Sequence, residues 1–201
     1  PVAMLYSYTD EAFTVWGHQG HLHRRFRDLV RAHIPVDIVF EEDIGNGVLS
    51  NYEVLIISGV RYMRRSFHER MERYCEDEGT LILDAETQLD LPGERVKVGD
   101  VAGVRAAVDG GLDEPLYADC DSPDVYLNTL KAGPVRYVFA VNDRRKFGPG
   151  VGEEGKIREK GVPQDVTVRI DESEAAVYEL TRGRKLAAGK KGDKLSVSLE
   201  L

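Results

Sequence analysis

Residues 52–87 read YEVLIISGVRYMRRSFHERMERYCEDEGTLILDAET, and this stretch decides the fold. It contains two continuous apolar runs, at residues 53–58 and 80–85, of the kind that a parallel sheet buries on both faces. Between them Phe67, Met71 and Tyr74 recur at helical spacing, which predicts an amphipathic helix. Two parallel strands joined through one helix form a right-handed crossover. We therefore expect an α/β sheet with helices on both faces.

Two further strands are predicted before this unit, at residues 2–7 and 36–40. An arginine-rich amphipathic helix over residues 22–31 joins them, and residues 8–20 are expected to form a polar and aromatic loop. The predicted strand order is 2-1-3-4, as in flavodoxin-like doubly wound folds, with residues 95–98 as a candidate fifth strand. The alternation of strands and helices is expected to end after Asp84.

From about residue 112 the pattern changes to period-two strands separated by Gly, Pro, Asn and Asp, and no helix is predicted there. The expected strands are residues 125–130, 135–142, 164–170, 175–181 and 194–201. Sequential antiparallel strands must close over a core, and a small β-sandwich does so most simply. The predicted domains are therefore residues 1–111, flavodoxin-like, and residues 112–201, a β-sandwich.

Composition is ordinary for a globular protein, with 42% apolar residues in 201. The formal net charge of −8 disfavours nucleic acid and anionic membranes as partners, and no apolar run is long enough to span a membrane. The chain starts at Pro1 and enters a strand at once, so we expect a piece of a longer polypeptide, whose localisation stays open. Cys75 and Cys120 are too few for a disulfide framework, although a bond between them stays open.

Ligands of open α/β sheets bind at the carboxyl ends of the strands. That edge gathers polar and aromatic residues: Tyr6, Ser7, Asp10, Trp16, His18, Glu42, Arg61, Tyr62, Asp84 and Glu86. The candidate ligand-binding residues are Trp16, His18, Glu42, Arg61 and Glu86, which would line a crevice suited to a sugar or another neutral polar molecule. The alternative is that these loops are merely polar, or are covered by a partner domain, and we favour it.

No catalytic residue, metal or cofactor is predicted. Neither turn after the central strands contains a Gly-x-Cys-x-Gly or Gly-x-Ser-x-Gly elbow, and Ser58 has only His68, on the helix, after it as a base. Three loosely spaced histidines, His18, His21 and His23, match no zinc pattern. Acidic residues after the strands are interpreted as polar lining. The glycine-rich segment 147–156 resembles a phosphate-binding loop but opens no helix, so a flexible loop is expected.

Several stretches of the first ninety residues resemble the middle, trimerisation domain of family 42 β-galactosidases and related glycoside hydrolases. They are VAMLYS at 2–7, the Trp16–Gly17 pair, IPVDIVFEEDI at 34–44, LSNYEVLII at 49–57 and RMERYCEDEGTLIL at 70–83. The remainder looks like the C-terminal β-sandwich of such proteins, through residues 135–145, 161–170 and 175–186. Residues 89–111 match no part of the family that we can name.

The resemblance implies a class I glutamine amidotransferase-like fold that has lost its nucleophile, and hydrolytic carboxylates that belong to a preceding (β/α)₈ barrel. It transfers no catalytic residue to this chain. The implied role is an accessory, assembly-supporting region of a larger glycoside hydrolase. Its implied partners are other domains of the same polypeptide, further copies in a homo-oligomer, and a carbohydrate at the loop around Trp16. A saccharide-binding module is the alternative function, and a free-standing hydrolase or amidotransferase is the least favoured.

Overall fold

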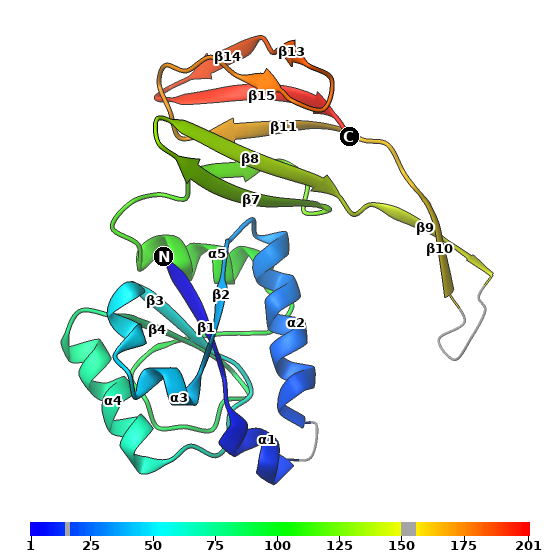
Figure 1. Ribbon diagram of the computed structural model, residues 1–201. Coiled ribbons are helices and arrows are strands. Elements are labelled where there is room, and N and C mark those ends of the chain that lie inside the picture. The colour runs from blue at the N-terminus through cyan, green and yellow to red at the C-terminus, as the bar shows by residue number, and fades with distance from the viewer. Residues whose placement is uncertain (15–16, 150–155) are drawn as a thin grey trace. The chain divides into compact units, whose positions relative to one another are not determined.

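The structure is a computed structural model that describes residues 1–14, 17–149 and 156–201. The chain forms two compact units, Pro1–Pro115 and Leu116–Leu201 (Figure 1). This division falls shortly after the domain boundary predicted between residues 111 and 112. Trp16 and most of the glycine-rich segment, residues 150–155, lie outside the described residues.

The first unit is built on a parallel sheet with the strand order β2-β1-β3-β4-β5. Its strands are β1 (Val2–Tyr6), β2 (Asp37–Phe40), β3 (Val54–Ile57), β4 (Thr80–Asp84) and β5 (Glu94–Val96). Its helices are α1 (Tyr8–Thr14), α2 (Gly17–Arg31), α3 (Glu41–Ile44), the 3₁₀ helix η1 (Val48–Asn51), α4 (Arg65–Glu76) and α5 (Val101–Gly110). The flavodoxin-like doubly wound sheet is confirmed, and β5 extends the predicted order of four strands.

Helices cover both faces of this sheet, with the strands between α4 and α2 (Figure 1). On one face, Ala3 and Leu5 of β1 share a buried core with Met71 of α4 and Ile44 of α3. α2 lies on the opposite face, and Arg105 of α5 donates to a backbone carbonyl at its C-terminal end. Because strands β1, β3 and β4 are buried on both faces, their sequences are continuously apolar, as the central stretch predicted.

Residues 8–20 do not form the loop that the sequence predicted, since α1 and the first turns of α2 occupy most of them. The N-terminus of α1 is held by Ser7, whose Oγ accepts the Asp10 N–H at 3.0 Å. Thr9 of the same helix donates through its N–H and its hydroxyl to Glu41. These tertiary anchors stabilise a seven-residue helix that shows no apolar periodicity.

The prediction that strand–helix alternation ends after Asp84 was also wrong, because β5 and α5 follow it. Asp100 caps α5, and its carboxylate accepts the Gly103 N–H at 2.8 Å. Val104 and Val108 are fully buried on one side of this helix. Two sequence signals of this helix were available: Asp100 as its cap, and the four-residue spacing of Val104 and Val108. Gly103 obscured them, because glycine disfavours a helix interior.

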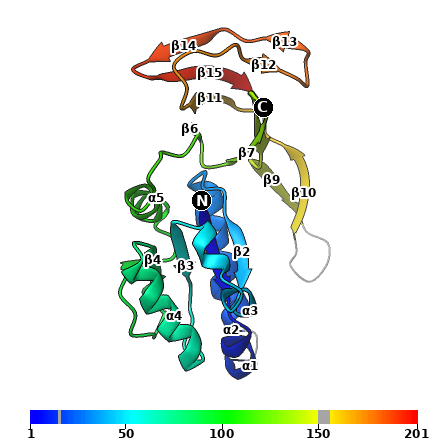
Figure 2. The ribbon, with the colours of Figure 1, turned by 60° about the vertical axis from the view of Figure 1, so that its left-hand side comes forward.

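The second unit consists of antiparallel strands. They are β6 (Ala118–Cys120), β7 (Val125–Ala132), β8 (Val135–Asn142), β9 (Arg145–Pro149), β10 (Lys156–Gly161), β11 (Asp165–Ile170), β12 (Tyr178–Glu179), β13 (Arg184–Lys185), β14 (Ala188–Lys191) and β15 (Lys194–Glu200). One sheet has the order β14-β15-β11-β6, and Figure 2 shows β14, β15 and β11 side by side. Strands β7 and β8 pair as a hairpin, as do β9 with β10 and β12 with β13.

A single apolar core joins the hairpin β7–β8 to the larger sheet. Val125 and Leu127 of β7 are buried in one cluster with Cys120 of β6, Val168 of β11 and Val197 of β15. Two antiparallel layers packed through their inner faces make the small β-sandwich that was predicted.

β9 and β10 were not predicted, because the glycine-rich segment 147–156 was expected to form a loop. The predicted strand at residues 175–181 shrinks to the two residues of β12, and the short strands β6, β13 and β14 were also not predicted. Strands this short show too few alternations for period-two patterning to identify them. Cys75 and Cys120 are free thiols rather than a disulfide. Within the described ranges, no helix combines the length and apolarity that a membrane span requires.

Candidate functional site

The carboxyl ends of β1 and β2 meet in a buried polar cluster built around Ser7. The Ser7 N–H donates to His18 Nε2 at 3.0 Å, and its hydroxyl donates to Glu41 Oε1 at 3.0 Å. Ser7 and His18 are 0% exposed, and Glu41 is 1% exposed. Because Nε2 accepts a hydrogen bond, the ring proton of neutral His18 sits on Nδ1. Nδ1 lies 3.9 Å from Asp10 Oδ2 and has no hydrogen-bond partner within the described structure.

Asp10 extends this cluster to the loop after β3. Its Oδ1 accepts the backbone N–H groups of Arg61 and Tyr62, at 2.7 and 2.8 Å. Asp10 is itself fully buried. The carboxylate therefore ties α1 to a neighbouring strand end and is not presented to solvent.

The electrostatics of His18 follow from its burial. Desolvation lowers the pKa of His18, while the Asp10 carboxylate acts in the opposite direction without overcoming it. The imidazole is therefore neutral at physiological pH. A neutral, enclosed imidazole is suited to holding the backbone at Ser7, directly after β1, rather than to exchanging protons with a ligand.

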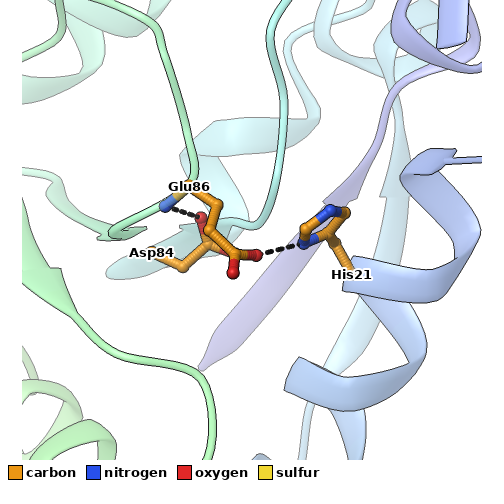
Figure 3. Close-up of side chains that lie close together, drawn as sticks. All are labelled: His21, Asp84 and Glu86. Atoms are coloured by element: carbon orange, nitrogen blue, oxygen red, sulfur yellow. Dashed lines mark hydrogen bonds and ion pairs between the residues drawn. The ribbon is translucent and has the colours of Figure 1, made fainter.

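A second cluster joins α2 to the end of β4: His21, Asp84 and Glu86 lie close together (Figure 3). The ring Nδ1 of His21 is 2.5 Å from Glu86 Oε2, an ion pair when the ring is protonated. Asp84 points at its own following turn, where its Oδ1 accepts the N–H groups of Glu86 and Thr87 and the Thr87 hydroxyl. Its Oδ2 accepts the Ser58 hydroxyl.

The charge of Asp84 is stabilised by these donors. Burial raises the pKa of Asp84, but hydrogen bonds from Ser58 and Thr87 outweigh it, so the pKa lies below its ordinary value. The carboxylate is ionised, buried and already provided with partners on both oxygens.

His21, Asp84 and Glu86 combine residue types that can ligate a metal ion. The candidate ligand atoms of His21, Asp84 and Glu86 lie within 4.8 Å of one another. However, Arg24 places a guanidinium nitrogen 3.0 Å from His21 Nδ1 and 3.8 Å from Glu86 Oε2, where a cation would have to sit. With one cation already present and Asp84 occupied by hydrogen bonds, the cluster suits an ion-pair network better than a divalent metal.

Ser58 was the remaining candidate nucleophile. It is 0% exposed, and its hydroxyl contacts the Asp84 carboxylate and, at 3.4 Å, the backbone carbonyl of His21. No imidazole in the described residues lies within hydrogen-bond reach of its Oγ, so they contain no Ser–His pair of the kind that activates a nucleophilic serine. Gly59 follows with φ +67°, and a Cβ there would collide with the His21 ring.

The five predicted binding residues differ in how far the structure buries them. His18 is buried, whereas Glu42, Arg61 and Glu86 are exposed, and Trp16 lies outside the described residues. His18 is therefore not available to line an open crevice. Whether the exposed residues bind a ligand stays a prediction.

Sequence reasoning missed the structural importance of Glu41, the residue next to Glu42. Glu41 is the buried member of the pair, and it accepts hydrogen bonds from Ser7 and Thr9. Three consecutive acidic residues follow β2, and only the direction of the first turn of α3 decides which of them points inward. The pairing of His21 with Glu86 was missed because α2 was expected to start later.

Residues 2–110 match the family model described as the beta-galactosidase trimerisation domain, which covers more than half of the chain. The chain belongs to this family. The match spans every strand and helix of the first unit, so the trimerisation domain comprises the parallel sheet and its helices. No curated protein matches the chain.

Solved structures share the fold of both units. An exo-carrageenase of family GH42 from Bacteroides ovatus has a TM-score of 0.61 at 17% identity, over 100% of this chain and 29% of that one. Alpha-L-fucosidase isoenzyme 2 from Paenibacillus thiaminolyticus has a TM-score of 0.64 at 13% identity, and the match covers 99% of this chain and 46% of that one. A catalytic mutant of Gan42B, a GH42 beta-galactosidase from G. stearothermophilus, has a TM-score of 0.61 at 14% identity, and the match covers 100% of this chain and 40% of that one. The chain thus spans less than half the length of each.

Proposed function

We propose that this chain is a non-catalytic assembly region of a larger glycoside hydrolase, and that it holds copies of that enzyme together. The observation that carries the proposal is the match of residues 2–110 to the trimerisation domain. The fold likeness to long carbohydrate-active enzymes, of which this chain spans a minor part, supports the larger context.

The carboxyl edge of the sheet supports the same conclusion. Its buried groups, Ser7, Asp10, Glu41 and Asp84, hydrogen-bond to one another or to backbone N–H groups of the neighbouring loops. A catalytic acid or base needs a free lone pair or proton facing the substrate. These side chains instead fix the loops that follow the strands.

The proposal is tested by measuring the mass of the 201-residue chain in solution by light scattering and sedimentation equilibrium, together with hydrolysis of nitrophenyl glycosides. A concentration-dependent oligomer without turnover is expected. A chain that stays monomeric when its concentration is raised about 100-fold contradicts the assembly role. Turnover that is lost in Glu86→Gln contradicts the non-catalytic role.

A saccharide-binding role is the second candidate, because an aromatic pair stands exposed near this edge. Phe13 is 70% and Tyr62 is 50% exposed, and their ring centroids are 5.3 Å apart. Exposed rings of this kind stack on the apolar faces of sugars, and the side chain of Arg61 next to them is exposed as well.

Titration with simple sugars, followed through the fluorescence of Trp16, the only tryptophan, tests this second role. Saturable quenching that is lost in Tyr62→Ala and kept in Tyr178→Ala, at a tyrosine of the second unit that is 58% exposed, is the expected result. An unchanged spectrum at millimolar sugar contradicts it.

A further inference from the structure

The imidazole of His18 is enclosed in a way that suits its neutral form. Its Nε2 accepts the Ser7 N–H at 3.0 Å, and the residue is 0% exposed. A proton on Nε2 would set two donors against each other at this distance, because a backbone N–H cannot act as an acceptor. The charged ring therefore does not fit the closed arrangement of β1, α1 and α2.

The other ring nitrogen offers a positive charge no compensating hydrogen bond. Nδ1 lies 3.9 Å from Asp10 Oδ2 and has no hydrogen-bond partner among the residues that the structure describes. The second oxygen of Asp10 is occupied by the N–H groups of Arg61 and Tyr62. A buried cation without a hydrogen bond to its counter-charge is costly, so an imidazolium is favoured where water reaches it.

Acidic side chains from two helices face this imidazole, and each favours a proton on it. They are Asp10 and Glu11 of α1 and Glu41 of α3. His21, on the same helix α2, acts in the opposite direction, and the ring of Tyr6 of β1 packs edge-on with a centroid distance of 5.4 Å. Burial outweighs the carboxylates and lowers the pKa of His18, so the closed arrangement disfavours the proton.

The same ring helps to hold α1 and the loop after β3. Ser7, which donates to the ring, also caps α1 by accepting the Asp10 N–H. Asp10 in turn holds the loop through the N–H groups of Arg61 and Tyr62. A helix of seven residues such as α1 is too short to be stable without tertiary anchors. Losing the bond between Ser7 and His18 therefore weakens the attachment of α1 and of this loop.

We propose that His18 is an acid-sensitive latch, whose protonation opens the junction of β1 and α1 and releases α1 together with the Arg61–Tyr62 loop. The first unit then has a closed form near neutral pH and a locally open form in acid. Phe13 of α1 and Tyr62 of the loop, whose exposed rings lie 5.3 Å apart, are separated in the open form. The latch is a conformational change within the first unit and does not depend on the proposed function.

The direction of the pH dependence follows from proton linkage. In the open form His18 meets water and regains its ordinary pKa of 6.5, whereas the closed form takes up the proton at lower pH. Acid therefore favours the open form. Each pH unit below 6.5 raises the open population by up to about tenfold until the pKa of the closed form is reached, and the rise between pH 7 and 5 is at most about thirtyfold.

Amide hydrogen exchange of the whole chain, followed by NMR between pH 7 and 5, tests the latch. Rates are corrected for the intrinsic pH dependence of exchange, and side-chain carboxyl groups ordinarily titrate below this range. The protection factors of the Ser7, Arg61 and Tyr62 amides should fall by about fivefold to thirtyfold. The Thr87 amide is the internal control, because Asp84 holds it, and its protection should stay constant.

Two histidine variants of α2 separate the latch from a general effect of acid. His18→Gln keeps an acceptor for the Ser7 N–H but takes up no proton, so its protection factors should be independent of pH in this range. His23→Gln, at an exposed histidine of the same helix, should behave as the wild type does. An NMR titration of the wild type needs no substitution: the Ser7 and Tyr62 amide signals should shift with the same midpoint as the His18 ring.

Each failure of the latch has its own signature. Constant protection of the Ser7 and Tyr62 amides from pH 7 to 5 overturns it. A loss of protection that His18→Gln retains also overturns it, because acid then acts through another group. An equal loss at Thr87 indicates global unfolding and contradicts a local opening. None of these results bears on the proposed function, which is tested by association at neutral pH.

Discussion

At the scale of single residues, the buried carboxylates and imidazole act as hydrogen-bonding anchors. Asp84 accepts from Ser58, Glu86 and Thr87, and His18 accepts from the Ser7 N–H. Each group orders a loop at the carboxyl edge, so the effect of removing it should be seen in stability.

Replacing Asp84 by Ala should lower the free energy of unfolding by about 3 kcal/mol, because several buried donors lose their acceptor. Asp84→Asn keeps one acceptor oxygen and should cost about half as much. Since the folded pKa of Asp84 is depressed, its contribution is present above its ordinary value of 3.8 and is lost as the pH falls through the folded value.

Urea denaturation between pH 2 and 7 measures this effect. The loss of stability at acid pH should be shallower in Asp84→Asn than in the wild type. Asp90→Asn, at an exposed aspartate of the following loop, is the control and should keep the wild-type slope. Equal slopes in all three proteins would contradict the assignment.

His18 should make stability fall as the pH drops below about 6.5, its ordinary pKa value. Burial lowers the pKa of His18 in the folded state, so the unfolded chain binds a proton in this range that the folded chain does not. His18→Gln, which keeps an acceptor for the Ser7 N–H, should flatten that dependence. An NMR titration in which the His18 ring protonates above pH 6.5 would refute the prediction.

At the scale of elements, α2 is attached to β5 and its following turn by a buried charge. Arg25 is 0% exposed and donates to the Val96 carbonyl of β5, with Asp28 at 3.8 Å. Asp28 accepts the Gly99 N–H at 2.7 Å. Burial lowers the pKa of Arg25, which shows that its charge is held at a cost.

Removing Asp28 should therefore be worse than removing Arg25. Asp28→Ala leaves a buried guanidinium without its counter-charge, and should destabilise by about 3–5 kcal/mol. Arg25→Met removes the charge but keeps much of the volume, and should cost about 2 kcal/mol or less. Chemical denaturation of the two single variants and the double variant checks this order, and the reverse order would contradict it.

At the scale of the whole molecule, each unit has its own core. One core contains Leu55, Met71 and Leu83, and the other contains Val125, Val168 and Val197. Neither cluster contains a residue of the other unit. A unit with a complete core is expected to fold by itself.

Residues 1–115 expressed alone should thus fold cooperatively, with near-native secondary structure by circular dichroism and a dispersed NMR spectrum. They should also associate as the whole chain does, because the trimerisation match lies within them. Residues 116–201 alone should not associate in this way. A collapsed, poorly dispersed spectrum for residues 1–115 would contradict the independence of the unit.

Much of the fold could be predicted from the sequence because it depends on local patterns. The apolar runs around residues 53–58 and 80–85 and the intervening helical spacing predicted a crossover that the structure confirms. Period-two alternation likewise identified β7, β8, β11 and β15. Helix α1 was not predicted, because its stability depends on a hydrogen bond to Glu41, which is far away in the chain.

The sequence by itself determined the class of the fold, the strand order and the absence of a nucleophile elbow, since patterning and turn chemistry are written in neighbouring residues. Only the tertiary structure decided which polar and apolar side chains are buried and which stay exposed. Glu41 rather than Glu42 points inward, His18 is enclosed, and Ile38 and Phe40 stay uncovered at the sheet edge. Those outcomes depend on helix orientation and on packing between distant segments, which no local pattern records.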